Sequence, residues 1–432
     1  MSTLTFKPGE AVSTVKQVAV IGLGYIGLPT AAILAGNGIA VTGVDLNPAV
    51  VAAVNQGKVP FVEPDLGIHV SGAVSQGLLS AQSTPPAADA YIVAVPTPFN
   101  ADKTADLSYI KAAAEALAPQ LVGGELIILE STSPPGTTEF MANVVLAQRP
   151  DLSLDGSQGR PQLMFAHCPE RVLPGRIMIE MVSNDRIVGG LTHEAAVAAA
   201  ALYGTFCQGN MHLTDAATAE MAKLVENAYR DVNIAFANEL SVISGNLGIN
   251  VWDLIELANH HPRVDILQPG PGVGGHCIAV DPWFIVAADP TNSTLIRAAR
   301  EVNDSKPAHV VADVLNAVKD IDRPVIAALG LAFKANIDDM RESPAVDIVR
   351  RLALANPDAR ILVAAPHADA LPRELAGLAN IVHTETHAAV GAADAVVLLV
   401  DHDAFREIDP TALAGKKVVD TRGFWRHTVA AG

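Results

Sequence analysis

The stretch that decides the fold is QVAVIGLGYIGLPTAAILAGNGIAVTGVD, residues 17–45. An apolar run, a glycine-rich turn, a helical run and a second apolar run follow one another. This order predicts a buried strand–helix–strand unit with parallel strands. Residues 17–44 carry no charge, so their length alone would also suit a membrane span. Pro29, Asn37 and the repeated glycines favour the buried unit instead.

The turn contains Gly22, Gly24 and Gly27 in the spacing G-x-G-x-x-G. The first two glycines allow a tight turn and close approach of the backbone to a pyrophosphate, and the third lets the helix pack on the strand. Asp45 ends the next strand, where a carboxylate accepts hydrogen bonds from ribose hydroxyls and repels a 2′-phosphate. We therefore predict NAD, rather than NADP, as cofactor. The alternative is a glycine-rich turn that only packs tightly.

The rest of the chain repeats the alternation of strands and helices. Strand candidates separated by helical patterns continue to about residue 190, long helices follow over 214–305, and the alternation then resumes to the C-terminus. We predict an α/β fold with two Rossmann-like, doubly wound parallel-sheet domains joined by a long-helix connector domain. The predicted boundaries are 1–212, 213–306 and 307–432.

Composition excludes several classes of function. The 432 residues are 50% hydrophobic and carry a net charge of −17, which argues against nucleic acid or an anionic membrane as the main partner. Cys168, Cys207 and Cys277 are odd in number and widely spaced, so they predict no disulfide framework and favour a reducing compartment. Residues 1–16 lack the pattern of a secretory leader. We expect a cytoplasmic protein.

Two later segments of the first predicted sheet end in polar residues. VPTPF (95–99) and ESTSPPGTT (130–138) each follow a strand candidate. Ligands of such sheets lie outside the carboxyl ends of the strands. Thr97 and Thr132 are therefore candidate cofactor contacts, although either could simply cap a following helix.

A polar stripe follows on the long helix predicted over residues 218–243. Glu220, Lys223, Asn227 and Arg230 are spaced three, four and three apart, so they share one face of the helix. The stripe could be a solvated set of salt bridges, which is the more common fate of such charges. It could also place a lysine and an amide where they stabilise an oxyanion. The pattern alone leaves both readings open.

The stretch PGPGVGGHCIAVDPWF, residues 269–284, raises the question of what Cys277 does. A metal site with His276 and Asp281 is disfavoured, because no further soft ligand stands at a typical spacing. A buried structural thiol is the default for an isolated cysteine. The surrounding glycines, however, let a ligand approach the backbone closely.

A thiol next to an NAD site suggests a specific chemistry. Cys277 could attack an aldehyde to form a thiohemiacetal, and oxidation would then give a thioester. A nearby Lys223 ammonium would lower the pKa of the thiol. Lys223 and Asn227 would also stabilise the alkoxide that forms on attack.

Five blocks together resemble the UDP-glucose/GDP-mannose dehydrogenase family. They occur in the family's order between residues 18 and 345, and they are VIGLGYIGLPTA, VPTP, AEMAKLVENAYRDVNIAFANEL, GPGVGGHCIAVDPWFI and LGLAFKANIDDMRESPA. The details look most like the bacterial UDP-N-acetyl-D-mannosamine dehydrogenase branch. The resemblance implies oxidation of the C6 alcohol of a nucleotide sugar to a carboxylate, with two NAD⁺ and one water consumed, in synthesis of a bacterial surface polysaccharide. It also implies a homodimer, built on the long helix, whose active sites are shared.

The resemblance also assigns residues by position. It makes Cys277 the nucleophile and Lys223 the general acid/base, assisted by Asn227 and Asp281, with no metal. The implied cofactor contacts are Gly22, Gly24, Tyr25, Ile26, Gly27, Asp45, Thr97, Thr132 and Arg341. The implied substrate contacts are Glu170, Arg171, Val172, Lys223, Asn227, Arg230, His261, Arg263, Gly274, Phe333, Lys334 and Arg422. UDP-glucose dehydrogenases have an acid where this chain has Pro174, which leaves Glu170 or Asp281 to activate the hydrolytic water.

Other functions remain open from the sequence. A UDP-N-acetylglucosamine or UDP-glucose 6-dehydrogenase would use the same chemistry. A two-electron hydroxyacid dehydrogenase shares the layout of domains but has no use for Cys277. A non-catalytic NAD sensor or redox switch would not need Lys223 and Asn227 beside that thiol.

Overall fold

The computed structural model describes residues 4–6, 13–61, 63–173, 175–275 and 278–426. The chain divides into two compact units, residues 1–225 and 226–432. The boundary falls within the long helix α8, Ala216–Leu247. Each unit is described by itself.

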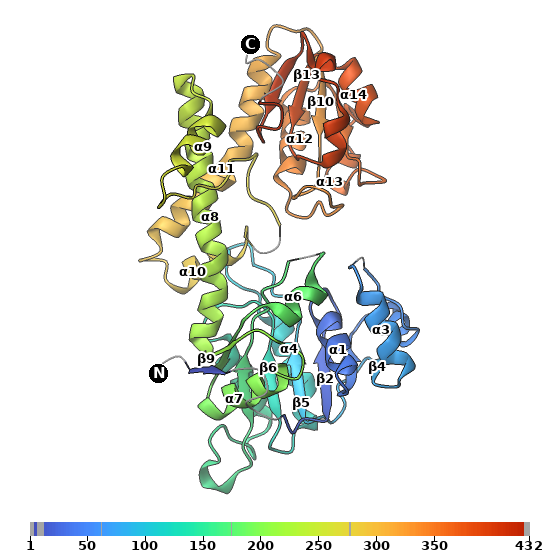
Figure 1. Ribbon diagram of the computed structural model, residues 1–432, viewed down its shortest axis with the longest axis vertical. Helices are drawn as coiled ribbons and strands as arrows, with labels where there is room; N and C mark the ends of the chain where they lie inside the picture. The colour runs from blue at the N-terminus through green and yellow to red at the C-terminus, as the bar shows by residue number, and fades with distance from the viewer. Residues whose placement is uncertain (1–3, 7–12, 62, 174, 276–277, 427–432) are drawn as a thin grey trace. The chain divides into compact units, whose positions relative to one another are not determined.

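The first unit is built on a nine-stranded sheet with the order β1-β9-β8-β7-β6-β5-β2-β3-β4 (Figure 1). Its strands are β1 (Leu4–Phe6), β2 (Gln17–Ile21), β3 (Ala40–Val44), β4 (Leu79–Gln82), β5 (Ala90–Val93), β6 (Leu126–Leu129), β7 (Met164–His167), β8 (Arg186–Gly190) and β9 (Met211–Asp215). The strands from β4 to β7 along this order are parallel. The sheet changes direction of winding at β2, because β3 pairs on one side of it and β5 on the other.

Helices cover both faces of this sheet. One apolar core joins the sheet to α1 (Gly27–Gly36), α3 (Leu66–Ser75), α6 (Ile177–Ser183) and α7 (His193–Tyr203). A second core joins it to α4 (Ser108–Leu117) and α5 (Thr137–Gln148), while α2 (Pro48–Asn55) follows β3. The runs AYIV and LIIL of β5 and β6 are buried at every position. Burial on both faces is the reason why such strands show no alternation of polar residues.

The predicted α/β fold with parallel sheets is confirmed, with two differences of detail. Strand β8 was expected to continue the parallel sheet, but it runs antiparallel to β7 and only then pairs parallel with β9. Strand β1 closes that edge antiparallel to β9. The sequence pattern shows that a segment is a buried strand but not which way it pairs, because pairing depends on distant residues.

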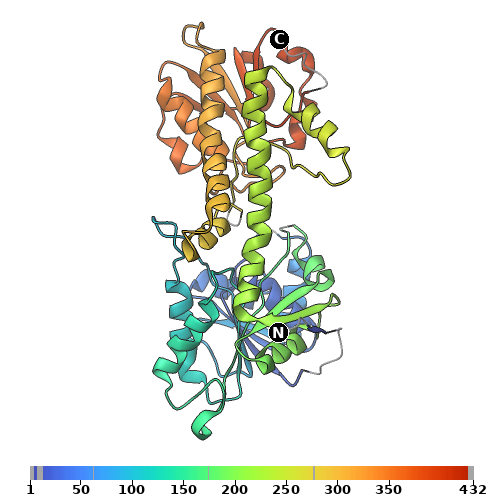
Figure 2. The ribbon, with the colours of Figure 1, turned by 90° about the vertical axis from the view of Figure 1, so that its left-hand side faces the viewer.

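The second unit begins with helices and ends in a smaller sheet. The helical part contains α8, α9 (Val251–Asn259), α10 (Asp281–Ala288) and α11 (Thr294–Ala317), and Figures 1 and 2 show α8 and α11 side by side. The sheet is fully parallel in the order β12-β11-β10-β13-β14. Its strands are β10 (Val325–Leu329), β11 (Arg360–Ala364), β12 (Ile381–His383), β13 (Ala395–Leu398) and β14 (Lys417–Asp420).

The smaller sheet is also covered on both faces. Residues of α11 and α12 (Pro344–Ala355) share one core with it, and α14 (Thr386–Ala392) contributes to the other. The short helix α13 (Arg373–Ala376) lies between β11 and β12 in the chain. Short 3₁₀ turns complete the described elements, at Ala118–Gln120, Ser157–Gly159, Asp403–Glu407 and Pro410–Leu413.

A buried cluster of ionisable side chains lies in the first unit, with Glu130 directly after β6, Glu170 after β7 and Arg186 at the start of β8. Glu130 is fully buried and accepts hydrogen bonds from the hydroxyls of Thr30 (3.0 Å) and Tyr203 (3.1 Å). Arg186 donates to Glu170 over 2.8 Å in the same region. Burial and the negative charge of Glu170 raise the pKa of Glu130 to about 8, although the charge of Arg186 opposes them. The Glu130 carboxyl is therefore mostly neutral at pH 7.

We predict that Glu130 makes the folded protein less stable as the pH rises. Its pKa is about 8 in the folded chain against an ordinary value of 4.5, so the folded state holds the proton more tightly between these values. Stability therefore falls from about pH 4.5 to about pH 8, by at most about 1.4 kcal/mol per pH unit. The variant Glu130→Gln should lose this dependence, measured as a smaller drop in Tm between pH 6 and pH 9.

The exposed Glu115 on α4 provides the control, because Glu115→Gln should leave the pH dependence of the Tm as it is in the wild type. An equally steep loss of Tm in the Glu130→Gln variant and the wild type would contradict the prediction.

Candidate functional site

The glycine-rich turn after β2 is too tight for side chains at two positions. Gly22 has a φ of +95°, and a Cβ there would lie 2.5 Å from the carbonyl oxygen of Ala94. A Cβ on Gly27 would lie 1.8 Å from the carbonyl oxygen of Gly22. At Gly24, by contrast, a Cβ would meet nothing within 4 Å. The backbone at Gly24 is therefore open to a ligand, directly before the N-terminus of α1, where free N–H groups favour phosphate.

Asp45 stands beside this turn at the end of β3. Its Oδ2 accepts a hydrogen bond from the backbone N–H of Leu23 over 3.0 Å, and its Oδ1 accepts one from Asn47 over 2.8 Å. These bonds orient the carboxylate next to the glycines, as recognition of a ribose requires. The donor and acceptor groups at this turn fit an NAD molecule.

The other predicted cofactor contacts of the first unit lie on the same edge of the sheet. Thr97 donates from Oγ1 to the carbonyl oxygen of Thr132 over 2.5 Å, which joins the loops after β5 and β6. Tyr25 is exposed, and its ring stacks on Phe61 with 4.3 Å between the ring centroids. Ile26 directly precedes α1. Sequence reasoning missed Phe61, because no pattern links that loop to the turn.

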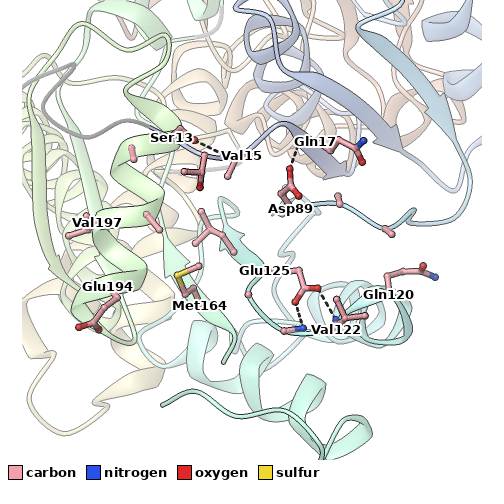
Figure 3. Close-up of a pocket in the computed structure, with 18 of the residues that line it drawn as sticks. Ser13, Val15, Gln17, Asp89, Gln120, Val122, Glu125, Met164, Glu194 and Val197 are labelled. Atoms are coloured by element: carbon pink, nitrogen blue, oxygen red, sulfur yellow. Dashed lines mark hydrogen bonds between the residues drawn. The ribbon is translucent and has the colours of Figure 1, made fainter. Parts of the chain in front are cut away.

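A hollow of about 780 Å³ lies at the opposite, amino-terminal ends of β2, β5, β6 and β7 (Figure 3). It contains no predicted site residue. Two of its carboxylates bind backbone N–H groups: Asp89 accepts from Lys16 and Gln17, and Glu125 accepts from Val122 and Gly123. We assign the cofactor site to the other end of the sheet for this reason.

The residues of the polar stripe on α8 differ in burial and in their partners. Glu220 is buried and its carboxylate binds the N–H groups of Gly136 (2.6 Å) and Thr138 (2.7 Å), so it caps the start of α5. Lys223 is half-buried and Arg230 is exposed. The stripe is therefore not a uniform solvated set of salt bridges.

Asn227 and Asp281 are brought together in the second unit. The amide of Asn227 donates from Nδ2 to Oδ2 of Asp281 over 2.5 Å, and both side chains are buried. Asp281 is the first residue of α10, so its carboxylate also faces the positive end of that helix. Cys277 and His276 lie outside the described residues.

The glycine segment before Cys277 packs directly on the C-terminal part of the second unit. A Cβ on Gly274 would lie 2.5 Å from the carbonyl oxygen of Glu342 and 3.1 Å from Cβ of Phe333. A Cβ on Gly270 would lie 2.6 Å from Nη1 of Arg422. The fold thus joins Gly274, Phe333 and Arg422, three predicted substrate contacts that are far apart in the sequence.

Arg422 is held in place by Asp401, which accepts from its Nε over 3.0 Å. Lys334 follows Phe333 and is exposed. A guanidinium and an ammonium are both groups that suit a diphosphate.

Of the remaining predicted contacts, Arg341 is linked to this cluster, because its partner Asp339 accepts from the backbone N–H of Phe333 over 3.0 Å. His261 and Arg263 are exposed on the turn after α9. Arg341 pairs with Asp339 over 2.6 Å. Glu170, Arg171 and Val172 follow β7 in the first unit, where Arg186 holds Glu170. Pro174 lies outside the described residues.

Comparison with known proteins identifies the family. The chain matches the NAD binding domain of the UDP-glucose/GDP-mannose dehydrogenase family over residues 16–207, the central domain over 217–305 and the UDP binding domain over 327–427. The chain belongs to this family. It is an NAD-dependent nucleotide-sugar dehydrogenase, and the predicted family and cofactor are confirmed.

Relatives in this family are similar over almost the whole chain. The NDP-N-acetyl-D-galactosaminuronic acid dehydrogenase of Ralstonia nicotianae is 55% identical over 411 residues, 95% of this chain and 96% of that protein. The UDP-N-acetyl-D-mannosamine dehydrogenase of Salmonella typhi is 52% identical over 418 residues, 95% of this chain and 99% of that one. The structure of a UDP-N-acetyl-mannosamine dehydrogenase from Staphylococcus aureus is 42% identical, with a TM-score of 0.82 and 96% of both chains covered.

Among the residues that the structure describes, no helix is long and apolar enough to cross a membrane. No group of three or more His, Cys, Asp or Glu side chains in these residues is placed to hold a metal ion.

We predict that Asp45 contributes much of the affinity for NAD. The variant Asp45→Asn should raise the Kd of NAD roughly 10- to 100-fold, because a hydrogen bond to a charged acceptor contributes about 1.5–3 kcal/mol. It should also narrow the preference for NAD over NADP, since the charge that repels a 2′-phosphate is gone. Isothermal titration calorimetry with each cofactor measures both effects.

Asp89 offers a matched control, because it also accepts two backbone N–H groups but lies at the other end of the sheet. Asp89→Asn should leave the Kd of NAD unchanged. An equal loss of affinity in both variants would show that only the fold was disturbed.

Proposed function

We propose that this enzyme oxidises UDP-N-acetyl-D-mannosamine at C6 to UDP-N-acetyl-D-mannosaminuronate in a four-electron reaction through Cys277. The observation that carries the proposal is the set of groups around the glycine segment of the second unit. On one side of Cys277 in the chain, Gly274 and Gly270 pack against Phe333 and Arg422. On the other side, Asp281 binds Asn227 of α8.

The choice of sugar rests on the relatives. The Salmonella typhi and Staphylococcus aureus proteins are named for UDP-N-acetylmannosamine, and they are 52% and 42% identical to this chain. The Ralstonia nicotianae protein, 55% identical, is named for an NDP-N-acetyl-D-galactosaminuronic acid, the acid that C6 oxidation of an N-acetylgalactosamine nucleotide would give. UDP-N-acetyl-D-galactosamine is therefore a second candidate substrate. All three names share an N-acetylated hexosamine, which favours that class over UDP-glucose.

The reaction assigns a task to each catalytic residue. NAD⁺ held at the turn of Gly24 and Asp45 would supply the hydride acceptor for the two oxidations at C6. Lys223 takes the proton of the C6 hydroxyl as the aldehyde forms, and Cys277 then attacks the aldehyde carbon to give a thiohemiacetal. The Lys223 ammonium and the Asn227 amide stabilise the oxyanion at C6. Loss of the second hydride gives a thioester at Cys277.

Water completes the reaction. It adds to the thioester carbon, the C–S bond breaks, and the carboxylate leaves while Cys277 is regenerated. Asp281 and Glu170 are the carboxylates available to take the proton of this water. Asp281 binds the Asn227 amide, whereas Glu170 forms a buried ion pair with Arg186.

The chain also offers a surface for a second copy. Four large apolar side chains of α8 are exposed, with 66% of Tyr229, 53% of Phe236, 44% of Ile243 and 67% of Leu247 accessible. Their spacing of seven, seven and four places them along one side of the helix. We propose that this α8 stripe forms the interface of a homodimer.

The setting of the reaction is part of the same proposal. The odd number of cysteines and the free thiols of Cys168 and Cys207 suit a reducing cytoplasm. The product would supply synthesis of a bacterial surface polysaccharide. The three predicted domains, 1–212, 213–306 and 307–432, would hold NAD, build the dimer and bind UDP.

We predict that the purified enzyme forms two NADH for each UDP-N-acetyl-D-mannosamine consumed, because oxidation of an alcohol to a carboxylate removes four electrons. Absorbance of NADH, together with mass spectrometry of the sugar product, gives the ratio. Rates with UDP-N-acetyl-D-galactosamine, UDP-N-acetylglucosamine and UDP-glucose should each be lower. A faster rate with one of these sugars would reassign the substrate.

The covalent step has its own test. Cys277→Ala should abolish production of the acid, while Cys207→Ala, a change at another cysteine outside the site, should retain it. Full turnover to the acid by Cys277→Ala, or a ratio of one NADH per sugar in the wild type, would refute the proposed route.

We predict that a charge in the α8 stripe weakens the dimer. Phe236→Glu should shift the mass in solution from two chains toward one, because the interface would have to bury an unpaired carboxylate. Sedimentation equilibrium measures the shift. Ile68→Glu on α3, where the side chain is 76% exposed, is the control and should not change the mass. A wild-type protein that sediments as a single chain would contradict the proposed interface.

A further inference from the structure

A chain of buried polar side chains connects an ion pair to the glycine segment. Asp231 and Asn238 lie on α8, and Arg300 and Asn303 lie on α11, all with at most 1% of their surface exposed. Arg300 donates from Nη1 to Oδ1 of Asp231 over 2.6 Å. Asn303 donates from Nδ2 to the same oxygen over 2.8 Å.

The chain then continues toward Gly270. Asn238 donates from Nδ2 to Oδ1 of Asn303 over 2.8 Å. The backbone N–H of Gly270 donates to Oδ1 of Asn238 over 2.9 Å. We call Asp231, Asn303 and Asn238 the amide relay. Among the described residues, it is the hydrogen-bonded connection between the Asp231–Arg300 ion pair and the glycine segment.

Asp231 determines which way each amide of the relay points. Its carboxylate and its backbone carbonyl oxygen only accept, and Asn303 donates from Nδ2 to both, over 2.8 Å and 3.0 Å. Asn303 must therefore turn its NH₂ group to Asp231 and its oxygen to Asn238. Asn238 must then give its own NH₂ group to Asn303, which leaves its oxygen for the N–H of Gly270. If the amides turned over, two N–H donors would face each other at Gly270, and both would lack an acceptor. The orientation that begins at Asp231 therefore places the Oδ1 acceptor of Asn238 at the N–H of Gly270.

The backbone at Gly270, where the relay ends, is closely packed. Gly270 lies seven residues before Cys277 and packs against Nη1 of Arg422, which a Cβ on Gly270 would approach to 2.6 Å. Two positions further on, Gly272 packs against the ring of Pro307 on α11 and against Pro344. A small displacement of Gly270 would therefore be transmitted to the segment that leads to Cys277 and to the guanidinium of Arg422.

Nearby amides hold only the earlier part of this loop. Asn233 on α8 binds the carbonyl of Asp265 and the N–H of Leu267. Asn259 at the end of α9 binds both backbone groups of Ile266. These contacts end before the first glycine, so the relay is what fixes the backbone at Gly270.

We propose that Asn238 is a positioning residue, which transmits the polarity of the Asp231–Arg300 ion pair through Asn303 to Gly270 and so holds the glycine segment where Cys277 can react. The inference rests on the proposed function, because it needs Cys277 as the nucleophile. Asn238 itself has no contact with the reacting atoms to make. Its effect on the reaction passes through the backbone of the loop.

The variant Asn238→Asp tests the relay with almost no change of shape. Its carboxylate can still accept from Gly270, but no orientation of Asn303 then satisfies both carboxylates beside it. The expected result is a fall in kcat of about tenfold or more, since a shift of about 1 Å in a reacting group can cost that much. The KM of NAD should stay within about twofold of the wild type, because NAD binds the first unit.

Alkylation of Cys277 by iodoacetamide gives a readout that loss of stability alone would not change. Mass spectrometry of peptides separates Cys277 from Cys168 and Cys207, which are buried and serve as internal references. In Asn238→Asp, the pH midpoint for alkylation of Cys277 should move toward that of an ordinary cysteine. Asn380→Asp is the matched control. The Asn380 side chain also binds the backbone, where it donates to the carbonyls of Ala353 and Asn356, but it lies far from the relay in the sequence and the fold. It should retain the wild-type kcat and midpoint.

Exchange of two relay residues provides a rescue. Asn303→Asp alone faces two carboxylates toward each other, and Asp231→Asn alone leaves Arg300 with Asp304 as its described ion-pair partner. The double variant restores one carboxylate next to residue 231, which then donates to residue 303, and residue 303 still accepts from Asn238. A carboxylate at position 303 also lies beside the backbone carbonyl of residue 231, so recovery is partial. We expect kcat of the double variant to exceed that of both single variants, a coupling that independent sites would not show.

The outcomes separate this inference from the function on which it rests. Wild-type kcat and alkylation in Asn238→Asp would overturn the relay, and so would a double variant no more active than the better of its parents. A fall in activity that only follows the amount of folded protein, with an unchanged midpoint for Cys277, would also overturn it. If Cys277→Ala still makes the acid, the proposed function fails instead, whatever the relay variants do.

Discussion

Close contact of backbone with backbone at two glycine segments is the constraint on which this molecule depends. At Gly27 a methyl group would fall 1.8 Å from the oxygen of Gly22, and at Gly274 it would fall 2.5 Å from the oxygen of Glu342. The first contact seats α1 against β2 with its N-terminus beside the open side of Gly24. The second seats the segment before Cys277 on the loop of Phe333. A residue with a side chain would keep either pair of backbone segments from packing so closely.

Buried charges in both units are matched with polar groups that limit their orientation. In the first unit, Glu170 forms an ion pair with Arg186, while burial and the charge of Glu170 raise the pKa of Glu130. In the second unit, Asp231 binds Arg300 and one amide. Such pairs add little net stability over an apolar core, but they admit few arrangements of their neighbours. In the second unit, the orientation that Asp231 imposes on its neighbours reaches the backbone of the glycine segment at Gly270.

Likeness over nearly the whole chain establishes the family and the cofactor, whereas the sugar depends on finer detail. Relatives named for mannosamine and for galactosaminuronic acid are 52% and 55% identical to this chain. Sugars that differ only in configuration are distinguished by the shape of a pocket, and shape leaves no short motif. Phe333 and Arg422, which pack against the glycine segment, are predicted substrate contacts. Arg422 is oriented by Asp401.

The sequence by itself determined the local parts of this protein. The spacing of Gly22, Gly24 and Gly27, with Asp45 after the next strand, predicted the cofactor turn, because that chemistry depends on neighbours in the chain. Only the tertiary structure decided the direction of β8 and the separate roles of the polar residues on α8, where Glu220 caps α5 and Asn227 binds Asp281. These outcomes depend on residues far apart in sequence, and periodicity along one helix or strand carries no information about such partners.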